Sequence, residues 1–491
     1  MLGSRCERRG AFGTAYRNPD ICNGPHPSVE GYTDDERKRL MVACCAAAFI
    51  TPLLSTMMNL SLDALGKEFS VGSHSLGYVN TAFLLSSVVF MVPLSRMADI
   101  SGKRRMFLAG VAMIAASCLL APFSTEFWMI IVFRALIGMG AAAVTCTSVS
   151  MITDVFDRGR RGWAIGINTT CVYVGLAAGP FVGGVLNDLL GWRSLFFVII
   201  PFAVVAVALM LTFRHEIAPF AGKRLSVRSS VVYGLSVLLS MGGVINLPEL
   251  WAVAVLAAGL ALLVVFVRLQ LASEDRILDV RLFRNRMFSG SCVAAFLNYA
   301  SSYSVSFFMA LYLQSLQGMS ATEAGLLMLL QPAVQAMLTP FFGKRSDSIA
   351  DKRILPTAGM LVIAAGVASI MFYDVGTPMW AIVATMVVTG VGFSLFSAPN
   401  TSVIMSSVPP ADTGEAAALV SVMRQTGMMV SMGIAMTVIS VMMGSADNIV
   451  PETYGAFVDV MRVSFAICTA MCLVGAATSM MRGKGCAGDR V

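Results

Sequence analysis

The chain has 491 residues, of which 57% are hydrophobic and only 13% are charged, and its net charge is +7. Soluble globular proteins carry about 25% charged residues, so this composition excludes a fully water-solvated surface and requires a lipid bilayer. The eleven cysteines form no C-x-x-C pair and mostly lie in apolar runs. They are therefore expected to be small buried side chains, and we expect no metal site and no cofactor.

Apolar segments recur along the chain at about the 20 residues that a helix needs to cross the hydrocarbon core. Residues 1–40 precede them, lack the apolar core of a signal peptide, and are expected to be a cytoplasmic tail, as are residues 483–491. The sequence thus predicts an all-α integral membrane protein with fourteen transmembrane helices. The predicted spans fall near 41–62, 78–98, 106–122, 128–150, 163–186, 194–213, 229–247, 250–268, 288–312, 323–342, 355–373, 379–405, 415–443 and 457–481.

Lysine and arginine gather in alternate loops, and the opposite loops hold almost none beyond Lys67 and Arg193. By the positive-inside rule both termini are cytoplasmic, which agrees with an even number of spans. The basic charge is therefore a topology signal, and nucleic-acid binding is not expected. The basic residues are Arg37, Lys38, Arg39, Lys103, Arg104, Arg105, Arg158, Arg160, Arg161, Lys223, Arg224, Arg228, Arg281, Arg284, Arg286, Lys344, Arg345, Lys352 and Arg353.

An internal repeat divides the chain. Residues 95–99, which end in Asp99, recur 248 residues later as 343–347, which end in Asp347, and both copies precede a basic run. The repeat predicts two six-helix halves, at 41–215 and 287–482, flanking an inserted transmembrane hairpin within 216–286. Parallel halves of this kind are typical of transporters, with the solute site near the midplane between them.

Two arginines are predicted to lie deep within spans, Arg134 and Arg424. A charge at such a depth costs about 2.5–3.5 kcal/mol on insertion scales, so each should face a polar interior. Arg134 could bind an anionic group, relay protonation or hold helices together; for Arg424 a structural role is favoured. The other deep polar residues are neutral and could line an amphipathic cavity or form interhelical hydrogen bonds. They include Asn59, Asn168, Tyr173, Asn298, Tyr303, Gln314, Gln331, Gln335 and Asn400.

Several motifs resemble those of the major facilitator superfamily, specifically its fourteen-helix drug:proton antiporters, over about residues 41–481. Residues 95–105 are similar to the superfamily's loop motif after helix 2, with Ser95 and Ile100 as departures. Arg134, Gly138 and Gly140 resemble the helix 4 motif. Residues 175–184 match the antiporter motif G-x-x-x-G-P-x-x-G-G completely, through Gly175, Gly179, Pro180, Gly183 and Gly184.

The resemblance implies roles for these motifs. Asp99, with Gly102, Lys103, Arg104 and Arg105, would close the cytoplasmic side by facing the positive N-terminus of the helix that begins near Gly414. Asp347 would face the start of the helix at Gly162 in the same way. The alternative is that these charges are solvated and only set topology.

The glycines of the antiporter motif form one bare stripe, at which helices approach closely, and Pro180 permits a bend. In the family this stripe is associated with export, although plain helix packing is compatible with the same residues.

One departure concerns coupling. The family's helix 1 carries an acidic residue linked with proton coupling, where this chain has Leu54. Asp63, which replaces the family's proline at the end of that motif, is the nearest titratable candidate.

An enzyme is not expected, because the three histidines lie in the tail and loops and no catalytic motif occurs. We expect a monomer in the plasma membrane that exports drugs or amphipathic metabolites by alternating access, in exchange for protons. An importer or uncoupled facilitator of the same fold is the main alternative, and a sensor or scaffold is a more remote one.

Overall fold

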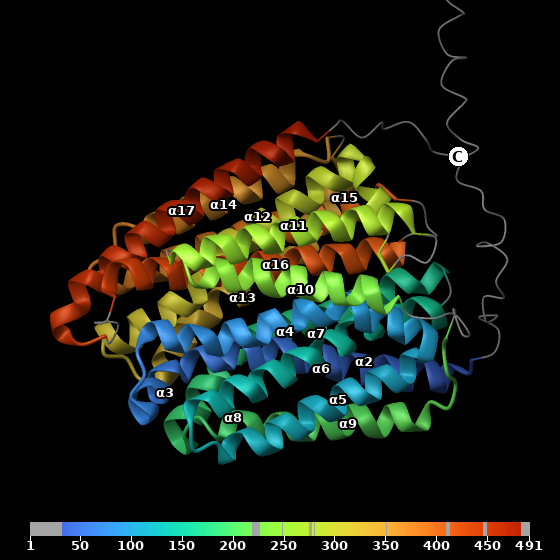
Figure 1. The fold of residues 1–491 in the computed structure, drawn as a ribbon, viewed down its shortest axis with the longest axis horizontal. Coiled ribbons are helices and arrows are strands. Elements are labelled where there is room, and N and C mark those ends of the chain that lie inside the picture. Colours follow the sequence, from blue (N-terminus) through green and yellow to red (C-terminus); the bar gives the residue numbers. More distant parts are fainter. Residues whose placement is uncertain are drawn as a thin grey trace, which may run out of the picture.

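The computed structural model shows a bundle of long helices that lie side by side (Figure 1). The predicted tails over residues 1–31 and 483–491, with Lys223 and Arg224, lie outside the described residues. Every regular element in the described part of the chain is a helix, as the composition predicted. The described residues are 32–156, 158–218, 226–247, 249–273, 277–278, 280–349, 351–408, 413–444 and 449–482.

The first half contains six long helical stretches that follow the predicted spans. They are α2 (Asp34–Leu60), α4 (Ser73–Ser101), α5 (Lys103–Leu120), α6 (Phe127–Val155), α7 (Arg158–Leu190) and the pair α8 (Ser194–Phe197) and α9 (Ile199–Thr212). The short helix α3 (Leu62–Phe69) lies between α2 and α4, and the 3-10 turn η3 (Ala121–Phe123) extends α5.

The second half repeats this order after two further helices, α10 (Val227–Ile245) and α11 (Leu250–Ala272). It contains α12 (Arg286–Leu311), α13 (Ala321–Ser348), α14 (Ile354–Ile370), α15 (Met379–Ser406), α16 (Thr413–Met443) and α17 (Tyr454–Met481). The short elements η4 (Val280–Arg284), the π-helical η5 (Tyr312–Leu316) and η6 (Pro451–Thr453) connect them.

The two halves pack alike. In the first half α2 packs on α7, α4 on α6, α5 on α6 and α9, and α2 on α9; in the second half α12 packs on α16, α13 on α15, α14 on α15 and α17, and α12 on α17. Each pair in one half thus has its counterpart in the other, which agrees with the internal repeat. In Figure 1 the first half fills the lower part of the view and the second half the upper part.

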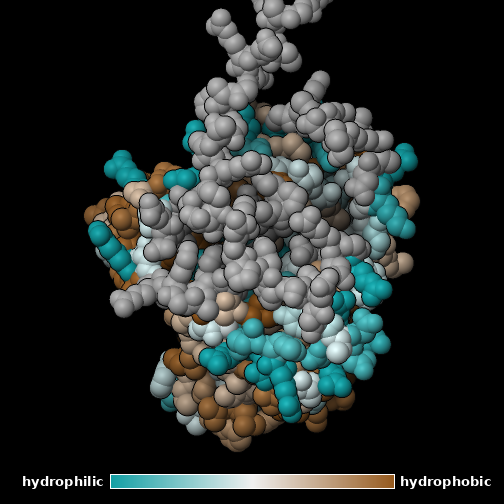
Figure 2. All heavy atoms as spheres, turned by 90° about the vertical axis from the view of Figure 1, so that its right-hand side faces the viewer, coloured by the Kyte–Doolittle hydropathy of each residue, from teal (hydrophilic) through white to brown (hydrophobic). Residues whose placement is uncertain are grey.

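The halves meet chiefly through α7 against α13 and through α4 against α16, which are equivalent pairs under the repeat. α10 and α11 pack on each other, and α10 also contacts α4 and α16, across the middle of Figure 1. We call the end at which α2 begins the basic end and the opposite one the distal end. Figure 2 looks onto the basic end, where many hydrophilic side chains gather and hydrophobic ones lie toward the left and the bottom of the view.

Twelve helices of the described chain are long and apolar enough to cross a membrane. The two remaining predicted spans correspond to α12 and α14, which fall short for different reasons. α12 carries six serines and Asn298 and is largely buried, as suits an interior helix. α14 has 17 residues, or about 25 Å at 1.5 Å per residue, somewhat less than the hydrocarbon thickness.

The first helix differs from its predicted bounds at both ends. α2 begins at Asp34, seven residues before the expected start at Met41, because Thr33 and Glu36 form a capping box that starts the helix early. It ends at Leu60, and the chain then turns into the separate helix α3. Asp63 therefore lies in the first turn of α3.

Candidate functional site

The predicted loop motif lies almost entirely in helices. Gly102 is the one residue between α4 and α5, and its φ of +114° belongs to a region that L side chains rarely adopt. A Cβ atom there would also lie 2.3 Å from Glu216 Oε1. Glu216 accepts a hydrogen bond of 2.9 Å from the backbone N–H of Arg104, and its Oε2 lies 3.5 Å from Arg105 Nε. Glu216 thus places a negative charge at the N-terminus of α5, where it is favourable.

Lys103 is buried, with 4% of its surface exposed, although it belongs to a basic run. Its Nζ lies 2.5 Å from Asp154 Oδ2 and 3.4 Å from Asp99 Oδ1. The recorded ion pair of Asp99 is therefore with its own motif, in the same half. The side chains at the start of α16, including Gly414, lie outside the described residues, and so does that of Asp347.

The glycine stripe of α7 packs closely on α2. A Cβ at Gly175 would lie 2.6 Å from the carbonyl oxygen of Phe49, and one at Gly183 would lie 2.8 Å from Met57 Cα. Gly179 faces Thr56 so closely that any side chain would clash with it. Only glycine allows the two backbones to approach to this distance.

The end of the same motif joins the two halves. A Cβ at Gly184 would lie 2.3 Å from the carbonyl oxygen of Ala321 on α13. Conversely, one at Gly325 on α13 would lie 2.2 Å from the carbonyl oxygen of Pro180. The antiporter motif is therefore a three-helix contact that links α2, α7 and α13.

Asp188, one turn beyond the motif, caps α13 from the opposite half. Its carboxylate accepts hydrogen bonds from the backbone N–H of Ala321 at 3.2 Å, from that of Thr322 at 2.7 Å and from the Thr322 hydroxyl at 2.5 Å. Ser320 and Glu323 complete the helix start with a capping box. A carboxylate at a helix N-terminus is stabilised by the helix dipole, so Asp188 joins the two halves at the distal end. The sequence analysis missed it, and an acid just after a glycine motif was its only signal.

Asp63 makes a second contact between the halves at the distal end. Its Oδ2 lies 2.6 Å from Lys67 Nζ, and its Oδ1 accepts a hydrogen bond of 3.2 Å from the Ser315 hydroxyl. Tyr454 in turn donates to the Ser315 carbonyl oxygen at 2.6 Å. Separation of the halves would break the Asp63–Ser315 bond and change the surroundings of the carboxylate.

Arg134 is fully buried in the first half. Its Nε donates to the carbonyl oxygen of Val79 at 3.1 Å, and Nη2 lies 3.5 Å from Asn80 Oδ1. Asn80 Nδ2 donates to Asn59 Oδ1 at 2.8 Å. Asn80, which was not predicted from the sequence, therefore links the predicted residues Arg134 and Asn59. The guanidinium also lies over the Phe83 ring, with Cζ 4.8 Å from its centroid.

Three polar pairs join the halves at intermediate depth. Each links a helix of the first half to one of the second, with O···O or N···O distances of 2.7–3.2 Å. Two of them contain predicted cavity residues. The pairs are Ser55 with Tyr303, Tyr173 with Ser397, and Gln425 with Ser87.

Arg424 lies beside this interface. It is half-buried, and its Cζ is 5.9 Å from the centroid of the Tyr299 ring on α12. Tyr299 precedes Tyr303 by one helical turn, so both rings lie on the same face of α12.

The other predicted cavity residues are spread through the bundle. Asn400 is committed to the second half, where it donates to the Ser291 carbonyl oxygen and accepts from Arg482. Asn298 donates to Met360 Sδ, and Gln314 to the carbonyl oxygen of Ala310. The remaining three are Asn168 and Gln335, which are buried, and Gln331, which is half-buried.

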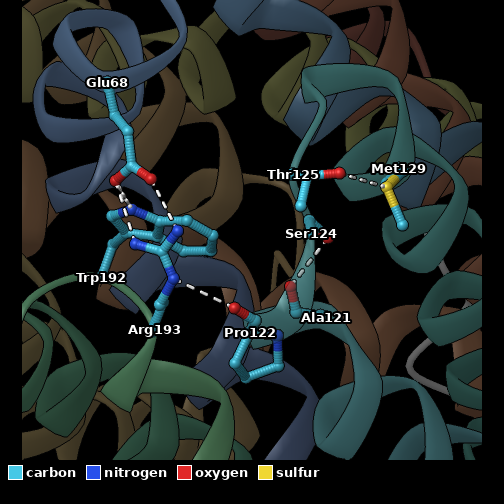
Figure 3. A network of polar contacts seen from close by, with 8 residues as sticks. All are labelled: Glu68, Ala121, Pro122, Ser124, Thr125, Met129, Trp192 and Arg193. Atoms are coloured by element: carbon cyan, nitrogen blue, oxygen red, sulfur yellow. Dashed lines mark hydrogen bonds and ion pairs between the residues drawn. The ribbon is translucent and has the colours of Figure 1, made fainter.

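A distal network fixes α3 to the loop after α7 (Figure 3). Arg193 donates to both oxygens of Glu68, at 3.1 and 2.6 Å, and Trp192 Nε1 donates to Glu68 Oε2 at 2.6 Å. Arg193 also donates to the carbonyl oxygen of Pro122. The Arg193 hydrogen bonds, with that from Trp192, hold the pKa of the Glu68 carboxyl below its usual range.

The described residues contain no cluster of His, Cys, Asp and Glu that could hold a metal. They contain two helical halves, a polar interface between them and, at the distal end, the Asp188 carboxylate on a helix of the opposite half. This arrangement defines a polytopic helical membrane transporter.

The comparisons with known proteins give the family. The model of the Major Facilitator Superfamily matches residues 44–277 and 291–483, so the chain belongs to that superfamily. It is 25% identical over 392 residues to the riboflavin transporter RibZ of Clostridioides difficile, covering 78% of this chain and 84% of that one. It is 26% identical over 399 residues to the multidrug resistance protein Stp of Mycobacterium tuberculosis, covering 79% and 73%.

Among solved structures, the fold is similar to that of a bacterial homologue of the human lysosomal transporter Spinster in an inward-facing, unoccupied conformation. The TM-score is 0.67 at 16% identity, covering 92% of this chain and 98% of that one. These likenesses confirm the predicted resemblance to a superfamily with drug-efflux members.

Proposed function

We propose that this chain is a secondary active transporter that exports drugs or amphipathic metabolites by alternating access, coupled to proton antiport. The observation that carries the proposal is the position of the antiporter motif. Its glycines join α2, α7 and α13 where the two halves meet. A change in this contact would therefore change how the halves separate around the site between them. The relation to a multidrug resistance protein favours the same class of solute.

The proposed topology follows from the two halves. α12 and α14 cross the bilayer with the twelve other spans, and α10 and α11 are an inserted hairpin within residues 216–286 that separates the halves at 41–215 and 287–482. The basic end then lies in the cytoplasm with both termini, in the plasma membrane, and the protein works as a monomer.

Alternating access requires one closure at each end of the bundle. At the distal end the closure is Asp188 on the N-terminus of α13. At the basic end we propose Asp99 and, by the repeat, Asp347, each facing a helix start of the other half. Lys103 would hold Asp99 in its own half while that closure is open.

Proton coupling needs a group whose proton affinity differs between the two open states. Leu54, which replaces the family's acid, is buried and cannot titrate. Asp63 is the proposed substitute because its bond to Ser315 crosses the halves and breaks when the distal end opens. The second candidate function, an uncoupled facilitator, is favoured by Leu54 itself.

The decisive experiment is an efflux assay with a panel of drugs in an exporter-deficient host, with and without a protonophore. Export that collapses with the protonophore is expected. Flux that ignores the protonophore and runs down a solute gradient would identify a facilitator, and net uptake would identify an importer.

Two glycines of α7 provide matched variants for this assay. A Cβ at Gly184 would strike the α13 backbone, whereas one at Gly166 meets nothing within 4 Å. Gly184→Ala should reduce export strongly at equal expression, and Gly166→Ala should not. Equal export by the two variants would contradict the role given to the motif.

A further inference from the structure

Two arginines lie deep in the bundle, and both side chains are positively charged. The ion pairs of the described chain lie near its two ends, and none includes Arg134 or Arg424. Both arginines lie well inside membrane-spanning helices, Arg134 on α6 of the first half and Arg424 on α16 of the second. The interior of the transporter therefore carries two positive charges that no described carboxylate neutralises.

The polar groups around Arg134 leave it short of acceptors. Its Nη1 is buried and has no hydrogen-bond partner within the described part of the chain. The Arg134 contacts are a carbonyl oxygen and a long bond to an amide, both neutral. Because a buried charge is costly unless it is paired, this arrangement favours a negatively charged partner from outside the chain.

Two tyrosines of α12 lie at the interface between the halves. Tyr299 faces Arg424. Tyr303, one turn later on α12, forms a hydrogen bond with Ser55 of the first half. Tyr173, from the first half, forms a hydrogen bond with Ser397 of the second half. Phenol rings thus lie at the interface between the halves, one of them beside Arg424, where they can stack on an apolar body or donate to an anion.

We infer that the transported solutes carry an anionic group, such as a carboxylate or sulfonate, which Arg134 and Arg424 attract into the interface between the halves. The inference rests on the proposed transport function and adds the charge class of the solute. A cationic solute would meet two like charges in a region of low dielectric constant and would be repelled. An anion between the halves would be attracted by a charge of each half, so its affinity depends on their separation, as alternating access requires.

Three dansyl compounds test the charge class with one fluorophore: dansylglycine is anionic, dansylamide is neutral and dansylcadaverine is cationic. Binding is measured by fluorescence on the full chain in nanodiscs, and flux is measured separately in proteoliposomes. We expect dansylglycine to bind the wild type most tightly and dansylcadaverine most weakly.

Arg424→Gln should weaken dansylglycine binding about 10- to 100-fold, as for the loss of a charged hydrogen-bond partner, and leave dansylamide unchanged. Arg424→Lys should retain most of the preference for dansylglycine over the other two compounds. Arg268→Gln is the matched control, because Arg268 is exposed on α11 and its loss changes the net charge equally. Arg424 is the better test because Arg134 also bonds α4 and its loss can unfold the chain.

Failure to bind dansylglycine, equal binding of the three compounds, tighter binding of dansylcadaverine, or an equal loss for all three in Arg424→Gln would each overturn the inference. Anion-selective binding without flux would support the site and refute the proposed transport. Flux that prefers dansylcadaverine would support transport and refute the anionic class.

Discussion

Replacing Asp188 by alanine should open the distal end. The substitution removes all three hydrogen bonds that the carboxylate accepts from Ala321 and Thr322 across the halves. Ser320 and Glu323 still cap α13 from within the second half, so the helix itself should persist. The change therefore acts on the contact between the halves.

The magnitude follows from the position of Asp188 at a helix N-terminus. Loss of a capping side chain costs about 0.5–2 kcal/mol, and an exposed charge at that position contributes about 0.3–1 kcal/mol. Because Asp188 is exposed, water can replace part of what is lost. We expect a net change of about 1 kcal/mol, which corresponds to about a fivefold shift in the ratio of distal-open to distal-closed molecules.

The shift can be measured as a distance distribution between spin labels at Glu126 and Glu452, which are exposed at the distal end of the two halves. Asp459→Ala is the control, because Asp459 pairs with Arg462 on its own helix and does not bridge the halves. An unchanged distance distribution in Asp188→Ala, or an equal change in the control, would refute this role of Asp188.

Four further predictions address the gate, the coupling, the distal network and the topology. Asp99→Asn should slow transport without affecting insertion, by a bias worth about 0.3–2 kcal/mol and up to about 30-fold in population, as measured by initial efflux rates. Asp63→Asn should flatten the pH dependence of export in proteoliposomes. Glu68 has a lowered pKa in the folded chain, so its stabilisation is present above the ordinary carboxyl pKa and is lost as the pH falls through the lower, folded value. The Glu68→Gln variant should therefore melt at a lower temperature than the wild type at pH 7. The two melting temperatures should converge in acid. Cysteine labelling from the two sides should place both termini and residues 99–105 in the cytoplasm, and an extracellular C-terminus would contradict the proposed topology.

Much of the fold could be predicted because its signals are local. Each apolar segment that the sequence marked as a span coincides with a helix, since in lipid the backbone must satisfy its hydrogen bonds within the segment. The repeat of residues 95–99 at 343–347 predicted two like halves, and the helices pack in equivalent pairs on the two sides. The early start of α2 has a local signal in Thr33 and Glu36, whereas the apolar pattern that predicted the span begins only at Met41.

The candidate site could be predicted only in part. Arg134, Tyr173 and Tyr303 stood out because polar residues are expensive in apolar spans. Asn80 was missed although it links Arg134 to Asn59, because one amide in a helix does not reveal its partner. Asn400 stood out equally, yet its contacts are to Arg482 and Ser291 within one half.

The sequence by itself determined that this chain is a two-half helical membrane protein of the transporter type, because hydropathy, loop charge and glycine spacing are written along single segments. Only the tertiary structure decided which groups meet between segments. Glu216 reaches Arg104 across 112 positions, and Asp188 reaches Thr322 across 134. Such pairs leave no periodic signal, because their proximity arises from how whole helices pack.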